Sequence, residues 1–237
     1  MSDPALAPPS PSVLTRRGFS AAGLSASLAA CATTAPAAGV PSPTGRQAYL
    51  FFSPEEAAFV EASCDALIPP GGDGPGATEA GVPVFLDRAL FGAYGTADGT
   101  YQRGPFAQGS PEQGYQLPAE PAGFYRVGIA DAEAWCRARH GDGFAGLDAG
   151  AKAEALSAMQ SGEASFATIP SALFFGTYWF DVRAGYFSDP VHGGNRDMAA
   201  WRMIGFPGAE TELRRFVGVR EPIFPEPVSL EQTTRRA

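Results

Sequence analysis

The stretch at residues 170–186, with the sequence PSALFFGTYWFDVRAGY, decides the fold. Pro170 is a favourable residue at the start of a helix, and large apolar side chains then recur at three- and four-residue steps. They cover more than one face of the predicted helix, so this helix must be buried against several neighbours. We expect it to form the centre of the core. Its apolar residues are Phe174, Phe175, Tyr178, Trp179, Val182 and Tyr186.

Helix signals also precede this stretch. Ser53 and Glu56 form a capping box with proline at the first helical position, which starts a helix that runs to Leu67. A second helix opens near Pro83 and stops at the glycines of residues 92–95. Both predicted helices carry apolar residues toward a common core.

Two more helices follow a long segment without periodicity at residues 96–121. Apolar residues at three- and four-residue steps predict a helix over residues 122–140. Asp148 is placed to cap another helix, which Gly162 ends. Alternating Val, Ile and Thr runs are missing, so we predict a mostly α fold: a single compact helical domain with long ordered loops.

Composition and charge limit the function. The chain has 237 residues and a formal net charge of -8, and no basic stripe offsets that charge, so a nucleic-acid partner is not expected. Its 29 glycines and 22 prolines predict long loops. We divide the chain into a signal peptide (1–31), a flexible linker (32–46), a helical domain (47–220) and an extended tail (221–237).

The first residues have the order of an export signal. Arg16 and Arg17 precede Phe19 and a short, mildly apolar stretch at residues 21–30. This pattern is typical of a twin-arginine signal, which exports folded cargo. We therefore expect the protein to be periplasmic.

The signal ends in a pattern that is typical of a lipoprotein. Small residues precede Cys31, which would become acylated and N-terminal after cleavage. Two or more acyl chains give a stable membrane anchor. Ordinary cleavage near Ala30 or Ala35 is the alternative, with Cys31 as an incidental residue.

Two cysteines remain in the mature chain. Cys64 and Cys136 could form a disulfide in an oxidising compartment, or they could be buried free thiols that behave as small apolar residues. No Cys-x-x-Cys-His motif occurs, so we expect no c-type haem on this chain.

The loop after the aromatic helix is the richest in polar and turn residues. Asp189 and His192, three positions apart, could bind a metal ion or shuttle a proton. Alternatively, the two glycines that follow make a tight turn, while the polar side chains cap the next helix. As a partner-binding loop it would use Asp189, His192, Gly193, Gly194, Asn195, Arg196, Asp197 and Trp201.

Motifs of the common enzyme classes are missing. The chain has no nucleophile elbow, P-loop or His-Glu-x-x-His, and its glycine-rich segment at residues 71–76 follows a helix rather than a strand. An exported protein with this sequence is first interpreted as a binding or accessory subunit. Two hypotheses compete with it. One is a stand-alone periplasmic enzyme or metal-binding lipoprotein, and the other is a lipoprotein with a structural role in the envelope.

Three ordered blocks resemble the gluconate 2-dehydrogenase subunit 3 family. They are residues 61–69 (EASCDALIP), residues 79–88 (EAGVPVFLDR), and residues 185–198 continued by 201–208. The resemblance covers about residues 47–209.

The resemblance implies a non-catalytic subunit of a membrane-associated dehydrogenase. Its partner would be a glucose-methanol-choline type flavoprotein that holds FAD and oxidises a sugar or sugar acid, and a third subunit could be a cytochrome with haem c. This chain would hold no cofactor itself. It would assist the folding and export of the flavoprotein. The lipoprotein pattern at Cys31 departs from a simple cleaved leader and suggests that this chain also anchors its partner to the membrane.

Overall fold

The computed structural model describes residues 48–72, 74–101, 103–107, 109–110, 113, 116–210, 217–220 and 226–236. The leader, with Arg16, Arg17, Phe19 and Cys31, lies outside the described residues, as does the linker.

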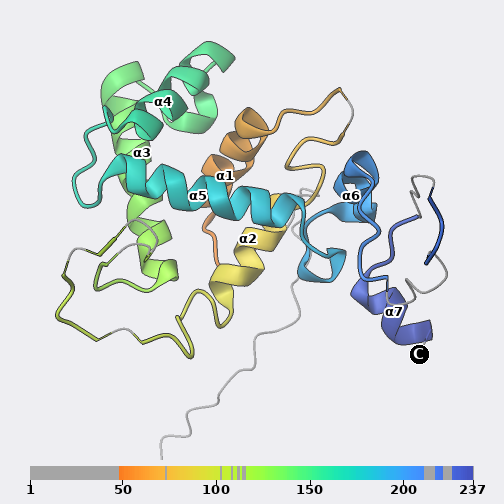
Figure 1. The fold of residues 1–237 in the computed structure, drawn as a ribbon. Helices are drawn as coiled ribbons and strands as arrows, with labels where there is room; N and C mark the ends of the chain where they lie inside the picture. Colours follow the sequence, from red (N-terminus) through yellow and green to blue (C-terminus); the bar gives the residue numbers. More distant parts are fainter. Residues whose placement is uncertain are drawn as a thin grey trace, which may run out of the picture. The chain divides into compact units, whose positions relative to one another are not determined.

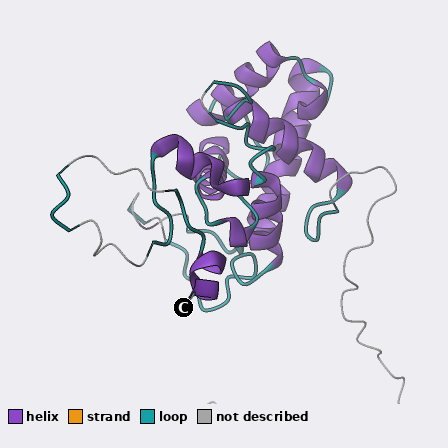
Figure 2. Cartoon of the chain, turned by 90° about the vertical axis from the view of Figure 1, so that its right-hand side faces the viewer, coloured by secondary structure: helices purple, strands orange, loops and turns teal. Residues whose placement is uncertain are grey.

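The described part is mostly helical, as predicted, and contains no strand (Figure 1, Figure 2). Its α-helices are α1 (Pro54–Leu67), α2 (Val82–Phe91), α3 (Pro121–His140), α4 (Ala149–Ser161), α5 (Ser171–Tyr186), α6 (Ala199–Ile204) and α7 (Leu230–Arg236). Three short 3-10 turns are η2 (Phe144–Gly146), η3 (Pro190–His192) and η4 (Arg196–Met198).

None of the helices in this described part combines the length and the apolar character that a bilayer crossing requires.

The caps predicted for the first and fourth helices are present. Ser53 N–H donates to Glu56 Oε2 at 2.8 Å and Glu56 N–H donates to Ser53 Oγ at 3.2 Å, which completes the reciprocal capping box. Asp148 Oδ1 accepts the N–H of Ala151 at 2.8 Å. Gly162 ends α4 in the left-handed conformation, which glycine adopts readily. These helix ends were therefore predictable from the local sequence.

Helix α5 lies at the centre of the core, as its aromatic residues predict. Phe174 stacks on Tyr178 with ring centroids 5.8 Å apart, and α5 packs against α2, α3 and α4 (Figure 1). Phe174 also contacts Phe59 of α1 and Phe124 of α3, at centroid distances of 6.5 and 6.1 Å. Each of these four side chains is only 1% exposed, so their burial is a major source of apolar stabilisation.

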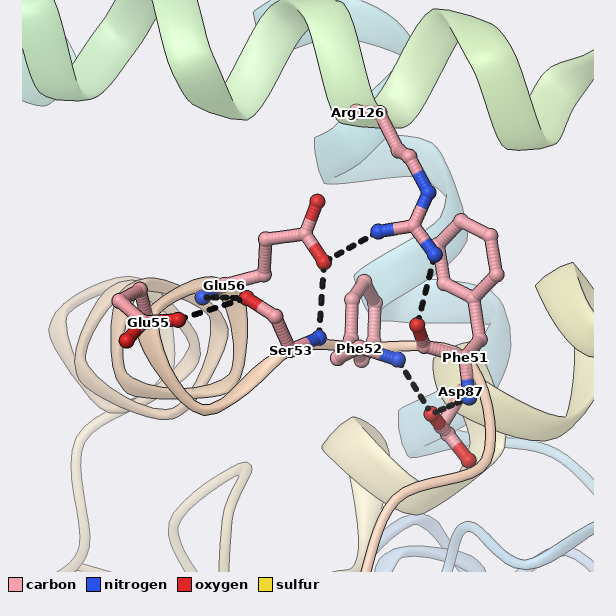
Figure 3. Close-up of polar contacts among 7 residues, drawn as sticks. All are labelled: Phe51, Phe52, Ser53, Glu55, Glu56, Asp87 and Arg126. Carbon is pink, nitrogen blue, oxygen red and sulfur yellow. Dashed lines mark hydrogen bonds and ion pairs between the residues drawn. The ribbon is translucent and has the colours of Figure 1, made fainter.

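The segment that leads into α1 is held by a buried carboxylate of α2. Asp87, which is 3% exposed, accepts the N–H of Leu50 through Oδ2 at 2.8 Å. Its Oδ1 accepts the N–H groups of Phe51 and Phe52 at 2.8 and 3.0 Å (Figure 3). A buried charge is stable only when it is paired or fully hydrogen-bonded, and these three N–H groups meet that need.

Arg126 of α3 fastens the same segment (Figure 3). Its Nη1 lies 2.5 Å from Glu56 Oε2, and its Nη2 donates to the carbonyl oxygen of Phe51 at 2.8 Å. The guanidinium carbon also lies 4.1 Å from the centre of the Phe51 ring. Helices α1, α2 and α3 therefore meet at the residues where the helical domain begins.

The prediction of an extended tail is wrong for residues 230–236, which form α7 (Figure 1). Residues 221–225 lie outside the described residues. A local signal for α7 was present in the sequence, because Ser229 and Gln232 form a second capping box with N–H···O distances of 3.2 and 3.4 Å. The prolines of the tail favour an extended chain, but each of them precedes the helix.

Gly128 lets α3 approach α5 closely. A Cβ atom at this position would overlap ring atoms of Phe174. Gly176 on the exposed side of α5 differs, because a Cβ atom there would have no heavy atom within 4 Å.

We predict that Gly128→Ala lowers the free energy of unfolding by about 1–3 kcal/mol, because the added methyl group overpacks the contact between α3 and α5. Gly176→Ala is the matched control. It should raise the free energy of unfolding by up to about 1 kcal/mol, since alanine is the better helix former and has space at this position. Urea denaturation of the purified proteins measures both changes. Equal effects of the two substitutions would contradict the tight contact at Gly128.

Candidate functional site

The loop after α5 begins with a carboxylate that caps two segments. Asp189, which is 8% exposed, accepts the N–H of Val191 through Oδ1 at 3.0 Å and so caps η3. Its Oδ2 accepts the N–H of Leu230 at 2.8 Å, at the first residue of α7. Pro190 suits the first position of η3, where a backbone donor is not needed. Asp189 therefore joins the loop to the C-terminal helix.

The loop then passes through residues in the left-handed conformation. Asn195, Asp197 and Met198 have φ angles of 44°, 57° and 56°. Asn195 is fully buried: its Nδ2 donates to the carbonyl oxygen of Ser188 at 3.0 Å, and its Oδ1 accepts the N–H of Ala200 at 2.9 Å. Asparagine tolerates this conformation better than most residues. Asp197 and Met198 keep it because the surrounding contacts fix the chain.

This loop packs on the segment that leads into α2. Arg196 N–H donates to the carbonyl oxygen of Ala80 at 2.9 Å. Gly81 has a φ of 85°, and a Cβ atom there would lie 2.5 Å from the carbonyl oxygen of Gly193, so only glycine fits. The second and third blocks of the family resemblance therefore form one structural unit.

Trp201 closes the loop from α6. Its Nε1 donates to the carbonyl oxygen of Phe187 at 2.8 Å, and its ring meets that of Phe206 edge-on at 5.2 Å. Gly208 lies beside the Trp201 ring and forms an isolated bridge with Val228 of the tail. The indole is 6% exposed, so its role is internal.

The predicted partner-binding residues separate into an internal and an external group. Asp189, Gly194, Asn195 and Trp201 are buried and build the loop. Gly193 is half-buried, and His192, Arg196 and Asp197 are exposed. A partner would therefore contact the external group, while the internal group holds that group in position.

Three exposed apolar side chains on the loop, α6 and α7 were not singled out in the sequence. Val191 is 49% exposed and Leu230 is 50% exposed. The two lie close together because their N–H groups bind the two oxygens of one carboxylate. Ile204, at the end of α6, is 55% exposed. Six-residue helices such as α6 are too short for periodicity to reveal which side faces outward.

The loop has the geometry of a turn with caps rather than that of an assembled metal site. Both carboxylate oxygens of Asp189 accept backbone N–H groups, and the N–H of His192 donates to the Asp189 carbonyl oxygen at 3.0 Å. Within the described ranges, no group of three or more His, Cys, Asp or Glu side chains is arranged to hold a metal ion. The turn-and-cap interpretation therefore agrees with the bonds of Asp189 and Asn195, whereas the side chains of Arg196 and Asp197 are exposed.

Cys64 and Cys136 are free, buried thiols, so the structure contains no disulfide between them. Cys64 Sγ lies 3.4 Å from the Tyr178 hydroxyl, which in turn lies 2.6 Å from Ser63 Oγ. Burial raises the pKa of the Cys64 thiol to about 12, and it also raises the pKa of Cys136. Both thiols therefore remain protonated and unreactive at neutral pH.

A partly buried carboxylate ties the long loop after α2 to α5. Asp181 Oδ2 accepts the hydroxyl groups of Tyr125 and Tyr94 at 2.6 and 3.0 Å. Burial raises the pKa of Asp181, and these hydrogen bonds act in the opposite direction. The contact positions the start of the loop. Asp181 thus has a structural role that the sequence did not reveal.

We predict that neither buried thiol reacts in the folded protein. In a Cys31→Ala chain, a thiol reagent at pH 8 should label Cys64 and Cys136 only after unfolding in urea. The free energy of unfolding should also fall at high pH, because the folded state favours the neutral Cys64 thiol. This contribution is complete below the ordinary pKa of 9.0 and is lost as the pH rises toward about 12. Urea midpoints across this range measure the fall, which should be shallower in Cys64→Ala. Rapid labelling of the folded chain would contradict the burial.

A model of the family described as gluconate 2-dehydrogenase subunit 3 matches residues 54–208, which is more than half of the chain. The match begins at the first residue of α1 and ends at Gly208, beside Trp201. No curated protein and no solved structure gives a significant match. The matched residues include α1 to α6 and the whole loop between α5 and α6. The chain therefore belongs to the gluconate 2-dehydrogenase subunit 3 family.

Proposed function

We propose that this chain is the accessory small subunit of a periplasmic, membrane-associated dehydrogenase that oxidises a sugar or sugar acid. The family match over residues 54–208 carries the proposal, since the family is described as one subunit of gluconate 2-dehydrogenase. The catalytic subunit in this proposal is a glucose-methanol-choline type flavoprotein that holds FAD. A cytochrome subunit with haem c would accept the electrons, and this chain contributes no catalytic residue.

The leader supports a role in export. Arg16, Arg17 and Phe19 have the order of a twin-arginine signal, and this route carries proteins that are already folded. A flavoprotein that binds its cofactor before export needs such a route. In our proposal the small subunit assists its folding and supplies the signal, and acylated Cys31 keeps the complex at the membrane.

The rigidity and the exposed residues of the loop at residues 187–201 favour a role in binding a protein partner. Internal hydrogen bonds fix its backbone, so little conformational freedom is lost when a partner binds. Exposed Val191 lies next to exposed His192, and the charged residues Arg196 and Asp197 are also exposed. Apolar side chains with polar neighbours are the usual composition of a subunit interface.

A stand-alone enzyme or metal-binding lipoprotein that uses Asp189 and His192 is the competing function. A metal ion at Asp189 would compete for the carboxylate with the N–H groups of Val191 and Leu230. Each N–H donor that lost the carboxylate and stayed buried would cost free energy. We therefore favour the accessory role.

Co-expression with the flavoprotein of the neighbouring gene should give a complex that survives purification. Val191→Arg should reduce retention of the flavoprotein by at least about tenfold, because it places a charge in the apolar part of the surface. Ala153→Arg, on the exposed side of α4, is the matched control and should have no effect. The proposal fails if the flavoprotein is equally soluble, exported and active without this chain.

His192→Ala separates the two functions. The accessory role predicts no stoichiometric metal by elemental analysis and unchanged dehydrogenase activity of the complex. A metal that is lost in His192→Ala would favour the competing function.

Substitutions in the leader should separate export from anchoring. Arg16→Lys combined with Arg17→Lys should leave both subunits in the cytoplasm, because the twin-arginine signal is lost. Cys31→Ala should leave export intact and release the complex from the membrane. Cell fractionation and mass spectrometry of the mature N terminus measure both results. An unmodified N terminus downstream of Cys31 would contradict the anchor and leave the export role standing.

A further inference from the structure

Residues 226–236, which we name the strap, are attached to the loop region at several points. Ala209 N–H donates to the carbonyl oxygen of Val228 at 2.7 Å, and Val228 N–H donates to that of Pro207 at 3.1 Å. Thr233 Oγ1 donates to the carbonyl oxygen of Ala209 at 2.9 Å. A fourth hydrogen bond is the one from Leu230 N–H to Asp189 described above. The strap thus contacts both the beginning of the loop and the segment that follows α6.

An ion pair adds a further attachment at the start of the strap. Arg202 Nε of α6 lies 3.1 Å from Glu226 Oε2. Arg202 Nη1 also donates to the carbonyl oxygen of Asp197, one of the residues in the left-handed conformation. The ion pair is exposed and contributes little by itself. Arg202 nevertheless links the strap to one of the residues of the loop that lie in the left-handed conformation.

The helix of the strap needs these attachments to be stable, because α7 has seven residues and isolated helices of that length are unstable in water. Val228 and Ser229, directly before α7, are 8% and 6% exposed. Their burial and the hydrogen bonds therefore supply the stability that the helix lacks.

The loop in turn needs external support. Asn195, Asp197 and Met198 lie in the left-handed conformation, which residues other than glycine rarely adopt. A residue keeps this conformation only where its surroundings fix the backbone. The side chain of Asp189 binds both the loop and the strap: one oxygen caps η3 inside the loop, and the other accepts the N–H of the first residue of α7.

We propose that the strap holds the loop of residues 187–201 in its left-handed conformation, and that Asp189 couples the two. The strap lies outside the residues that match the family, so it is a separate element that supports the matched region. When the strap detaches, Asp189 loses one of its two donors and the loop opens more often.

Leu230→Pro tests the coupling in the full chain. Leu230 is the first residue of α7, a position where proline is well tolerated in a helix. Proline has no N–H, so the substitution removes the bond to Asp189 while Asp189 and its cap on η3 remain unchanged. Leu230→Ala is the matched control, because it shortens the same side chain and keeps the N–H.

Hydrogen exchange followed by mass spectrometry gives the result. We expect Leu230→Pro to raise the exchange rate of the Arg196 and Ala200 amides by roughly tenfold relative to Leu230→Ala, as for the loss of a hydrogen bond to a charged group. A chain that ends at Pro225 should show at least the same increase.

Two outcomes would overturn the proposal. In the first, Leu230→Pro raises exchange within residues 226–236 but leaves the loop at the rate of the alanine control. In the second, the chain that ends at Pro225 keeps the loop amides as protected as in the full chain. Exchange of core amides in α5 reports whether either variant has simply unfolded.

Discussion

Asp87 accepts three backbone N–H groups that have no helical partner, those of Leu50, Phe51 and Phe52. Asp189 does the same for two segments near the other end of the described chain. Bonds from N–H groups to an ionised carboxylate are stronger than those between neutral groups, and a buried carboxylate without donors is costly. Each aspartate and the backbone it holds therefore depend on each other. The aromatic core fixes the helices, and these carboxylates fix the segments that enter and leave them.

Much of the fold was predictable because its signals are local. The capping box at Ser53, the cap at Asp148 and the aromatic periodicity of α5 depend on residues within a few positions of one another. Helix α7 was missed although its capping box was visible, because a seven-residue helix has no measurable period and depends on docking to form. The role of Asp87 could not be predicted, since its acceptor function requires a segment more than thirty positions away.

The sequence places a polar loop after α5, but it does not show which side chains of that loop are buried. The sequence grouped Asp189, Asn195 and Trp201 with exposed residues, whereas the structure buries all three. Polarity alone does not show whether a side chain serves the backbone or a partner. The left-handed conformation of Met198 has no local signal, because methionine has no preference for it. The pairing of the loop with Ala80 and Gly81 likewise depends on tertiary packing.

The fastening at Asp87 and Arg126 also determines how the domain responds to tension. A chain that is tethered at its N terminus is pulled through the residues directly before α1. That pull is shared by the three bonds to Asp87 and by the bond from Arg126 to Phe51, which act in parallel on neighbouring residues. If the N terminus is anchored as proposed, helix α1 would therefore be stretched only after this group of bonds has failed.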